Sequence, residues 1–184
     1  MNRDLVGIFA ALCAFGLIST AAAADLEDIS NFRQYSPQFA SSGQPSAKQL
    51  QLVQDAGFER VIYLAFTTDH TAIDDEDAVV KELGMDYVHI PVDWENPTGS
   101  DFYAFVGVLQ AGPSQKTLLH CQVNFRASSF SFLYRVIYLG MGVADAKEDL
   151  DSVWKPNGTW RKFIFDVLQE NELSPECDVC DWAP

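Results

Sequence analysis

The side chains best suited to covalent chemistry lie in one segment, residues 120–128, which reads His-Cys-Gln-Val-Asn-Phe-Arg-Ala-Ser. The apolar run before it, 117–119, predicts a buried strand, and apolar residues at helical spacing after it, ending at Gly140, predict a helix. A cysteine between the two lies at the positive end of the helix dipole, which favours the nucleophilic thiolate. Backbone N–H groups at the helix start and the planar guanidinium of Arg126 are suited to binding a phosphate-like oxyanion.

This segment resembles the signature of the protein tyrosine/dual-specificity phosphatase superfamily, which is His-Cys, five residues, Arg, then Ser or Thr. Here only four residues separate Cys121 from Arg126, the hydroxyl comes two places after the Arg, and Asn124 stands where that family usually has glycine. Asparagine tolerates the left-handed backbone that such a position requires. The resemblance implies that Cys121 is the nucleophile, that Arg126 holds the phosphoryl oxygens and that His120 supports the loop through hydrogen bonds to its backbone. It also implies that the rest of the loop contacts substrate: Gln122, Val123, Asn124, Phe125, Ala127 and Ser128.

A second segment, His89 to Thr98, contains the carboxylate that the resemblance makes the general acid. That superfamily carries an Asp in a loop some thirty residues before the Cys, and Asp93 lies 28 residues before Cys121. A carboxylic acid can protonate the departing oxygen of a phosphate ester. Glu95 is the next candidate for this role.

Two other functions fit part of the pattern. Four residues between Cys and Arg is the spacing of rhodanese sulfurtransferases, in which Cys121 would carry a persulfide. The missing loop glycine is compatible with a non-catalytic pseudophosphatase that only binds oxyanions or phosphoproteins. A rhodanese has no need of an acid such as Asp93, so the second segment favours a phosphoric monoester hydrolase acting through a phosphocysteine.

Residues 1–24 have the features of a cleaved secretory signal: basic Arg3, an apolar run of 14 residues from Leu5 to Ile18, and Ala22-Ala23-Ala24 before Asp25. We therefore expect a periplasmic or secreted protein with one domain over residues 25–184. Removing Arg3 and Asp4 from 12 basic and 26 acidic residues leaves 11 and 25, so the net charge stays −14. Such a charge argues against nucleic acid as a partner. We expect a phosphorylated protein or small molecule as substrate, and a monomer without a membrane span after processing.

Strand and helix patterns alternate along the chain, which predicts a single α/β domain with a largely parallel sheet and helices on its faces. Expected strands are 60–66, 87–92 and 117–120, with one or two short edge strands within 32–44. Expected helices are 46–56, 74–83, 98–110, 143–153 and 159–171, besides the one that follows residues 120–128, the Cys loop. Sites in such sheets lie at the carboxyl ends of the strands, which places 67–70, 93–96 and the Cys loop on one rim. Asp69 and His70 could touch substrate there, although a plain surface loop is the simpler interpretation.

The remaining cysteines of the expected mature chain, Cys177 and Cys180, lie in a tail that begins at about residue 174. In an exported protein a local disulfide is the expected state of such a pair, and it would keep both thiols away from Cys121. The three histidines do not have the spacing of a metal site. We expect neither a metal nor a cofactor.

Overall fold

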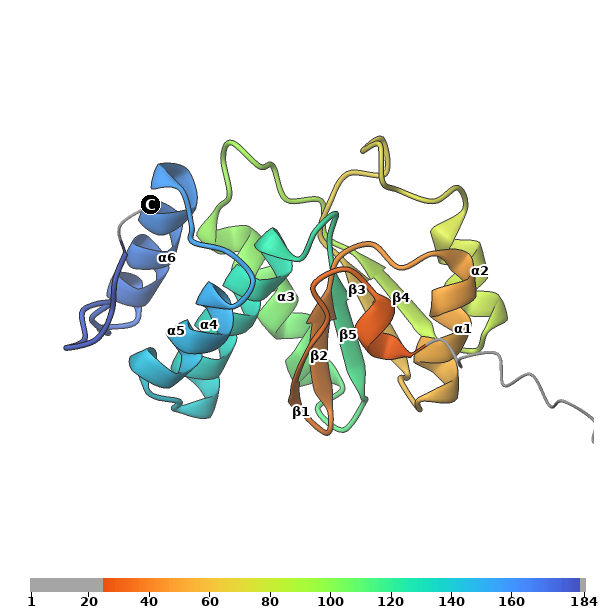
Figure 1. Cartoon of the computed structure of the whole chain (residues 1–184), viewed down its shortest axis with the longest axis horizontal. Coiled ribbons are helices and arrows are strands. Elements are labelled where there is room, and N and C mark those ends of the chain that lie inside the picture. The colour runs from red at the N-terminus through yellow and green to blue at the C-terminus, as the bar shows by residue number, and fades with distance from the viewer. Residues whose placement is uncertain (1–24, 183–184) are drawn as a thin grey trace, which may run out of the picture.

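The structure, a computed structural model, describes residues 25–182 (Figure 1). A short 3-10 helix, η1, is followed by five strands and six α-helices in this part of the chain. In chain order the elements are η1 Leu26–Asp28, β1 Arg33–Ser36, β2 Phe39–Ser42, α1 Ala47–Asp55, β3 Arg60–Tyr63, α2 Glu76–Glu82, β4 Asp86–His89, α3 Gly99–Ala111, β5 Thr117–His120, α4 Phe125–Leu139, α5 Val143–Asp151 and α6 Gly158–Glu170.

The five strands form one sheet in the order β1-β2-β5-β3-β4. β1 and β2 pair antiparallel, whereas β2 with β5, β5 with β3, and β3 with β4 are parallel. The predicted α/β fold with a mostly parallel sheet is therefore confirmed. The expectation of edge strands within residues 32–44 is correct for β1 but wrong for β2, which lies inside the sheet because its outer side pairs with β1 and its inner side with β5.

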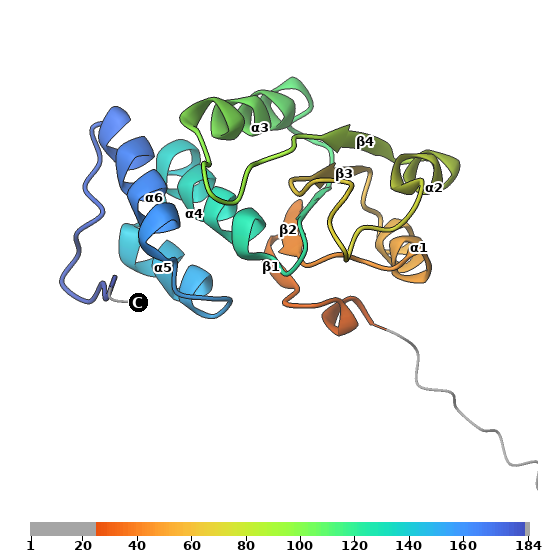
Figure 2. The same cartoon turned by 90° about the horizontal axis from the view of Figure 1, so that it is seen from above.

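Helices cover both faces of the sheet, with α1 and α2 on one side and α3, α4, α5 and α6 on the other (Figures 1 and 2). Side chains of successive strand residues point to opposite faces, and this alternation divides the core in two. Leu118 and Val61 pack with α1 and α2 residues, while Leu119 and Ile62 pack with the aromatic side chains of α3, α4 and α6.

Local signals in the sequence place several helix ends as predicted. Ser46 and Gln49 form a reciprocal capping box at α1, and Thr98 and Asp101 form another at α3. α4 ends at Gly140, which adopts a left-handed φ of 66° that favours glycine.

The loops after β3, β4 and β5 lie at the same end of the sheet, the upper end in Figure 1. This end carries the carboxyl termini of the parallel strands, so the predicted common rim is present. Near the C-terminus of the chain, the predicted disulfide between Cys177 and Cys180 is confirmed. The expected targeting segment, residues 1–24, lies outside the described residues. Within residues 25–182, no helix has the length and apolar character needed to span a membrane.

Candidate active site

The loop that carries Cys121 joins the central strand β5 to the N-terminus of α4. The Cys121 side chain is fully buried, and its backbone N–H donates a hydrogen bond to the Ser42 carbonyl at 3.3 Å. The segment that follows β2 also holds the Cys121 loop, because the Gln44 N–H donates a hydrogen bond to the Gln122 carbonyl at 3.0 Å. A side chain at Gly43 would place its Cβ 2.9 Å from that same carbonyl oxygen. Glycine is therefore required at position 43 for the end of β2 to approach the Cys loop.

Asn124 provides the backbone turn that starts α4. Its φ of 72° lies in the left-handed region, as expected for an asparagine that replaces a loop glycine. The side chain also connects the loop to the segment before β1, because Asn124 Nδ2 donates to the Asn31 carbonyl at 2.6 Å. Asn31 Nδ2 in turn donates to the Val123 carbonyl at 3.0 Å. Two asparagines thus hold the loop where a glycine would supply only conformational freedom.

Arg126 lies in the first turn of α4, only 4% exposed, with its guanidinium fixed on several sides. Its Nε donates to the Val92 carbonyl at 3.1 Å and its Nη1 donates to Gln122 Oε1 at 3.3 Å. The guanidinium carbon stands 5.3 Å from the centre of the Trp94 ring, which is cation–π geometry. The loop after β4 therefore contacts Arg126 through Val92 and Trp94, so the two segments singled out in the sequence meet in space.

A cavity of about 390 Å³ opens at this place. The Cys121 and Arg126 side chains line it together, and the loop after β3 adds Asp69. Its complete lining is Asp69, Trp94, Cys121, Gln122, Val123, Phe125 and Arg126. All three segments of the predicted rim thus contribute to one cavity that is large enough for a phosphate and part of the group that carries it.

Three of the predicted substrate contacts lie behind the cavity rather than along it. Asn124, Ala127 and Ser128 are buried and absent from the cavity lining. The Ser128 hydroxyl donates to the Phe125 carbonyl at 3.2 Å within its own helix, and Ala127 packs in the core. In this arrangement only Gln122, Val123 and Phe125 of the six predicted residues present side chains to a ligand.

The two carboxylates of the rim differ in where they point. Asp93 is exposed and its Oδ1 accepts a hydrogen bond from the Glu95 backbone N–H at 2.9 Å, away from the cavity lining. Asp69 lines the cavity, its Oδ2 lies 3.9 Å from Arg126 Nη2, and that oxygen is buried without a hydrogen bond to the described residues. Asp69 had been placed on the rim from the sequence, but its strand-end position gave no sign that the side chain turns inward.

His120 is positioned differently from the expectation. The ring is fully buried, and neither of its nitrogens makes a hydrogen bond to the described residues, so it does not fasten the Cys loop through the backbone. Instead, His120 Nε2 lies 3.1 Å from Glu76 Oε1, with the oxygen out of line for a hydrogen bond. In the part of the chain that the structure describes, no group of three or more His, Cys, Asp or Glu side chains could hold a metal ion.

Aromatic rings form one wall of the cavity. Phe125 stacks on Trp154 with 4.5 Å between ring centres and 5° between planes. Trp94 lies 5.3 Å from Trp160, whose indole N–H donates to the Trp94 carbonyl at 3.0 Å. Trp154 is partly buried and supports the cavity through Phe125. A flat, rigid wall beside Arg126 suits an aromatic group on the ligand.

Comparison with known proteins places this geometry in a family. No protein-family model matches the chain, and no curated protein matches it. Among solved structures, a candidate phosphatase of the DUF442 family from Shewanella putrefaciens CN-32 is 33% identical, with a TM-score of 0.72 over 79% of this chain and 96% of that one.

Two more distant structures share the fold. P. aeruginosa TpbA in complex with phosphotyrosine is 21% identical, with a TM-score of 0.57, over 75% of this chain and 78% of that one. The core catalytic domain of the PP-IP phosphatase SIW14 from S. cerevisiae is 12% identical, with a TM-score of 0.61, over 77% of this chain and 93% of that one. The chain therefore belongs to the DUF442 family, and it shares the fold of the tyrosine/dual-specificity cysteine phosphatases.

Proposed function

We propose that this protein hydrolyses phosphoric monoesters through a phosphocysteine intermediate on Cys121. The observation that supports this most is the shared cavity, in which the thiol of Cys121 and the guanidinium of Arg126 are held by β5 and α4. The thiolate attacks phosphorus while the bond to the leaving oxygen breaks, and that oxygen takes a proton. Water then attacks the phosphocysteine, releasing phosphate and restoring the thiolate. Arg126 and the loop N–H groups stabilise the phosphoryl oxygens in both steps.

Two carboxyl groups compete for the role of proton donor. Asp93 has the position along the chain that the superfamily gives its acid, and we propose it for that role, with its side chain turning inward when substrate binds. Asp69 is the second candidate because it already lines the cavity. Whichever carboxyl reaches the leaving oxygen must carry a proton in order to act as the general acid.

Leaving-group dependence separates these two carboxyls. General acid catalysis raises the reaction rate by roughly 10²- to 10⁴-fold, and an activated aryl oxide leaves without needing that proton. Asp93→Asn should therefore lose activity mainly on poor leaving groups, and Asp69→Asn should show a small, uniform loss. The opposite pattern in the two variants would move the proton donor to Asp69.

We propose aryl phosphates, including phosphotyrosine, as the preferred substrate class. The support is the aromatic wall of Trp94 and Phe125, against which a phenyl ring can stack beside Arg126. TpbA, which shares the fold, has been captured with phosphotyrosine. The net charge of −14 disfavours anionic substrates at long range. Arg126 and the α4 N-terminus must then attract the phosphate locally.

The decisive experiment is hydrolysis of a series of aryl phosphates by the purified protein, run beside transfer of sulfur from thiosulfate to cyanide. We expect aryl phosphate turnover that disappears in Cys121→Ser, because a hydroxyl is a far weaker nucleophile than a thiolate. Sulfur transfer without phosphate release would instead favour the rhodanese-like function that the four-residue spacing allows. Phosphate binding with neither activity would indicate a pseudophosphatase.

We also propose that the protein works outside the cytoplasm as a monomer. The Cys177–Cys180 disulfide supports an oxidising compartment. Fractionation of the source cells, followed by determination of the N-terminal residue, tests whether residues 1–24 are removed and where the protein is found.

A further inference from the structure

Three aromatic rings lie side by side in register at the carboxyl ends of β5, β3 and β4. Tyr63 on β3 pairs with His120 on β5 and with His89 on β4. The Tyr63 and His120 ring centres are 4.7 Å apart with planes 19° apart, and those of Tyr63 and His89 are 5.3 Å and 16° apart. Because Tyr63 covers one face of His120, the imidazole is confined directly before Cys121.

A buried carboxylate is in contact with this histidine. Glu76 begins α2 and is only 5% exposed, and its Oε1 lies 3.1 Å from His120 Nε2. It is within ion-pair distance of no lysine or arginine of the described residues. A buried carboxylate without a cationic partner is costly, because hydrogen bonds from neutral groups replace only part of the hydration that it loses. Its neighbour able to carry a positive charge is His120, so a proton on the imidazole would balance the Glu76 carboxylate.

The same carboxylate is connected to the Cys loop by a second route. Gln44 Nε2 donates to Glu76 Oε1 at 3.0 Å, while the Gln44 backbone N–H donates to the Gln122 carbonyl. Glu76 therefore contacts the residue before the nucleophile directly and the residue after it through Gln44. A change in its charge would act on both sides of Cys121.

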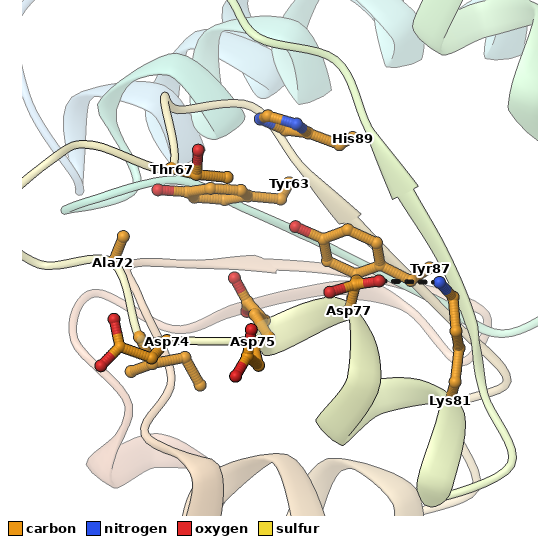
Figure 3. A pocket seen from close by; sticks show the side chains of 11 residues that line it. Tyr63, Thr67, Ala72, Asp74, Asp75, Asp77, Lys81, Tyr87 and His89 are labelled. Atoms are coloured by element: carbon orange, nitrogen blue, oxygen red, sulfur yellow. Dashed lines mark hydrogen bonds and ion pairs between the residues drawn. The ribbon is translucent and has the colours of Figure 1, made fainter.

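Figure 3 shows the cavity that Glu76 lines, on the side of the sheet opposite to the nucleophile's helix. It measures about 380 Å³ and is lined by Glu76, whereas His120 lies outside its lining. The Tyr63, Tyr87 and His89 rings lie along one side, and Asp74, Asp75 and Asp77 lie along the other. Burial raises the pKa of Tyr63 and of Tyr87, and the nearby Glu76 raises both further.

We propose that Glu76 is a positioning residue that keeps a proton on His120, and that the resulting imidazolium favours the thiolate form of Cys121. A positive charge beside a cysteine stabilises its thiolate. Several titratable or charged groups surround the pair. They are Tyr63 and Tyr87 on the sheet, His89 beyond Tyr63, Asp74, Asp75, Asp77 and Lys81 in the cavity, and Cys121, Asp69 and Arg126 on the rim. Lys81 is paired with Asp77 at 2.8 Å. The inference rests on the proposed role of Cys121 as nucleophile, but its test requires no turnover.

The test measures alkylation of Cys121 by iodoacetamide between pH 5.5 and 9.5, with the alkylated residue identified by peptide mapping. Only the thiolate reacts, so the rate follows its population. Glu76→Gln preserves the side-chain shape and should react about tenfold more slowly at pH 6, equivalent to about one pH unit. The difference should vanish at the alkaline end. The matched control, Asp74→Asn, removes the same charge from an exposed residue of the same cavity and should stay within about twofold of wild type.

A double-mutant cycle then asks whether Glu76 acts through His120. In a His120→Asn background, Glu76→Gln should cause less than about twofold further loss, because the proton it would hold is gone. Any of three results would overturn the proposal. The alkylation rate could be unchanged in Glu76→Gln, it could fall equally in Asp74→Asn, or Glu76→Gln could still lower it tenfold in the His120→Asn background.

A measurement on the unmodified protein covers the case in which Glu76→Gln fails to fold. Nitrogen-15 NMR of labelled histidine, with the His120 signals identified by their loss in His120→Asn, reports the protonation of both ring nitrogens. We expect an imidazolium at pH 7. A neutral ring at that pH would refute the inference whatever the variants do. Absence of phosphatase activity would leave these results intact and would count only against the proposed function.

Discussion

Replacing Arg126 by lysine tests the central claim about the site. Arg126 reaches the cavity with its Nε and Nη1 occupied by Val92 and Gln122, which fix the plane of the guanidinium. Lysine keeps the positive charge but has neither the plane nor the fork of donors. The ammonium can satisfy one neighbour or one phosphoryl oxygen well, but it cannot hold the others in the arrangement that the arginine provides.

The expected loss can be worked out from those contacts. One charge-assisted hydrogen bond to the phosphoryl group disappears, worth about 1.5–3 kcal/mol, and the loosened anchoring adds about 1 kcal/mol. The total of roughly 2.5–4 kcal/mol corresponds to about 60- to 700-fold in kcat/KM, since about 1.4 kcal/mol is a factor of ten. Vanadate, which occupies the same place as the transferred phosphoryl group, should bind correspondingly more weakly.

The assay is the kcat/KM of wild type and Arg126→Lys on one activated aryl phosphate, with vanadate inhibition measured in parallel. Arg161→Lys is the control, because Arg161 donates to the Trp182 carbonyl at 2.7 Å on the far side of α6 and lies outside the cavity lining. Thermal unfolding of both variants shows whether the fold is kept. An Arg126→Lys protein within about threefold of wild type, with unchanged vanadate affinity, would refute the reasoning and make Arg126 a structural anchor only.

Three further predictions concern the loop, the pH dependence of stability and the thiols. Asn124→Ala should lower the free energy of unfolding by about 2–3 kcal/mol, because alanine is strained in the left-handed backbone and the hydrogen bond to Asn31 is lost. Asn124→Gly loses only the hydrogen bond and should lower it by about 1 kcal/mol. Equal losses of the two variants in urea denaturation would contradict this. Burial raises the pKa of Tyr63 above its ordinary value of 10.0, which means that the folded protein favours the neutral phenol. The stability that the buried neutral phenol contributes is therefore complete below about pH 10 and is lost as the pH rises further. The urea midpoint of wild type should therefore fall more steeply above pH 10 than that of Tyr63→Phe, and parallel curves would count against it. In denatured, unreduced protein, alkylation and peptide mapping should label Cys121 and leave Cys177 and Cys180 unlabelled until reduction; a disulfide to Cys121 would instead point to a redox switch.

The sequence by itself determined those features that depend on neighbours along the chain. The capping boxes at Ser46 and Thr98 can be predicted because a hydroxyl and an acceptor three residues later satisfy each other's backbone donors locally. β5 was predicted with its observed bounds because a short apolar run leading into the Cys loop has few alternatives. The nucleophile and the arginine of the candidate site also lie within one local loop, so their meeting required no knowledge of the fold.

Pairing between strands is decided by the tertiary structure. β2 looks like an edge strand in the sequence because it is short and rich in serine. It lies inside the sheet because it pairs with β5, about 78 residues further along the chain, on one side and with β1 on the other. No local pattern specifies a partner at that separation, since the choice depends on how the helices cover both faces of the completed sheet.

The direction of loop side chains was equally beyond the reach of the sequence. Asp93 turns outward because its carboxylate caps the Glu95 N–H, while Asp69, on a loop that looked ordinary, lines the cavity. The contact between Glu76 and His120 joins the start of a helix to a strand 44 residues away, and it exists only because α2 packs against the sheet. Residue types and spacing thus reveal the chemistry available to one loop. Which distant charges surround that loop depends on packing, because electrostatic interactions act through space and take no account of distance along the chain.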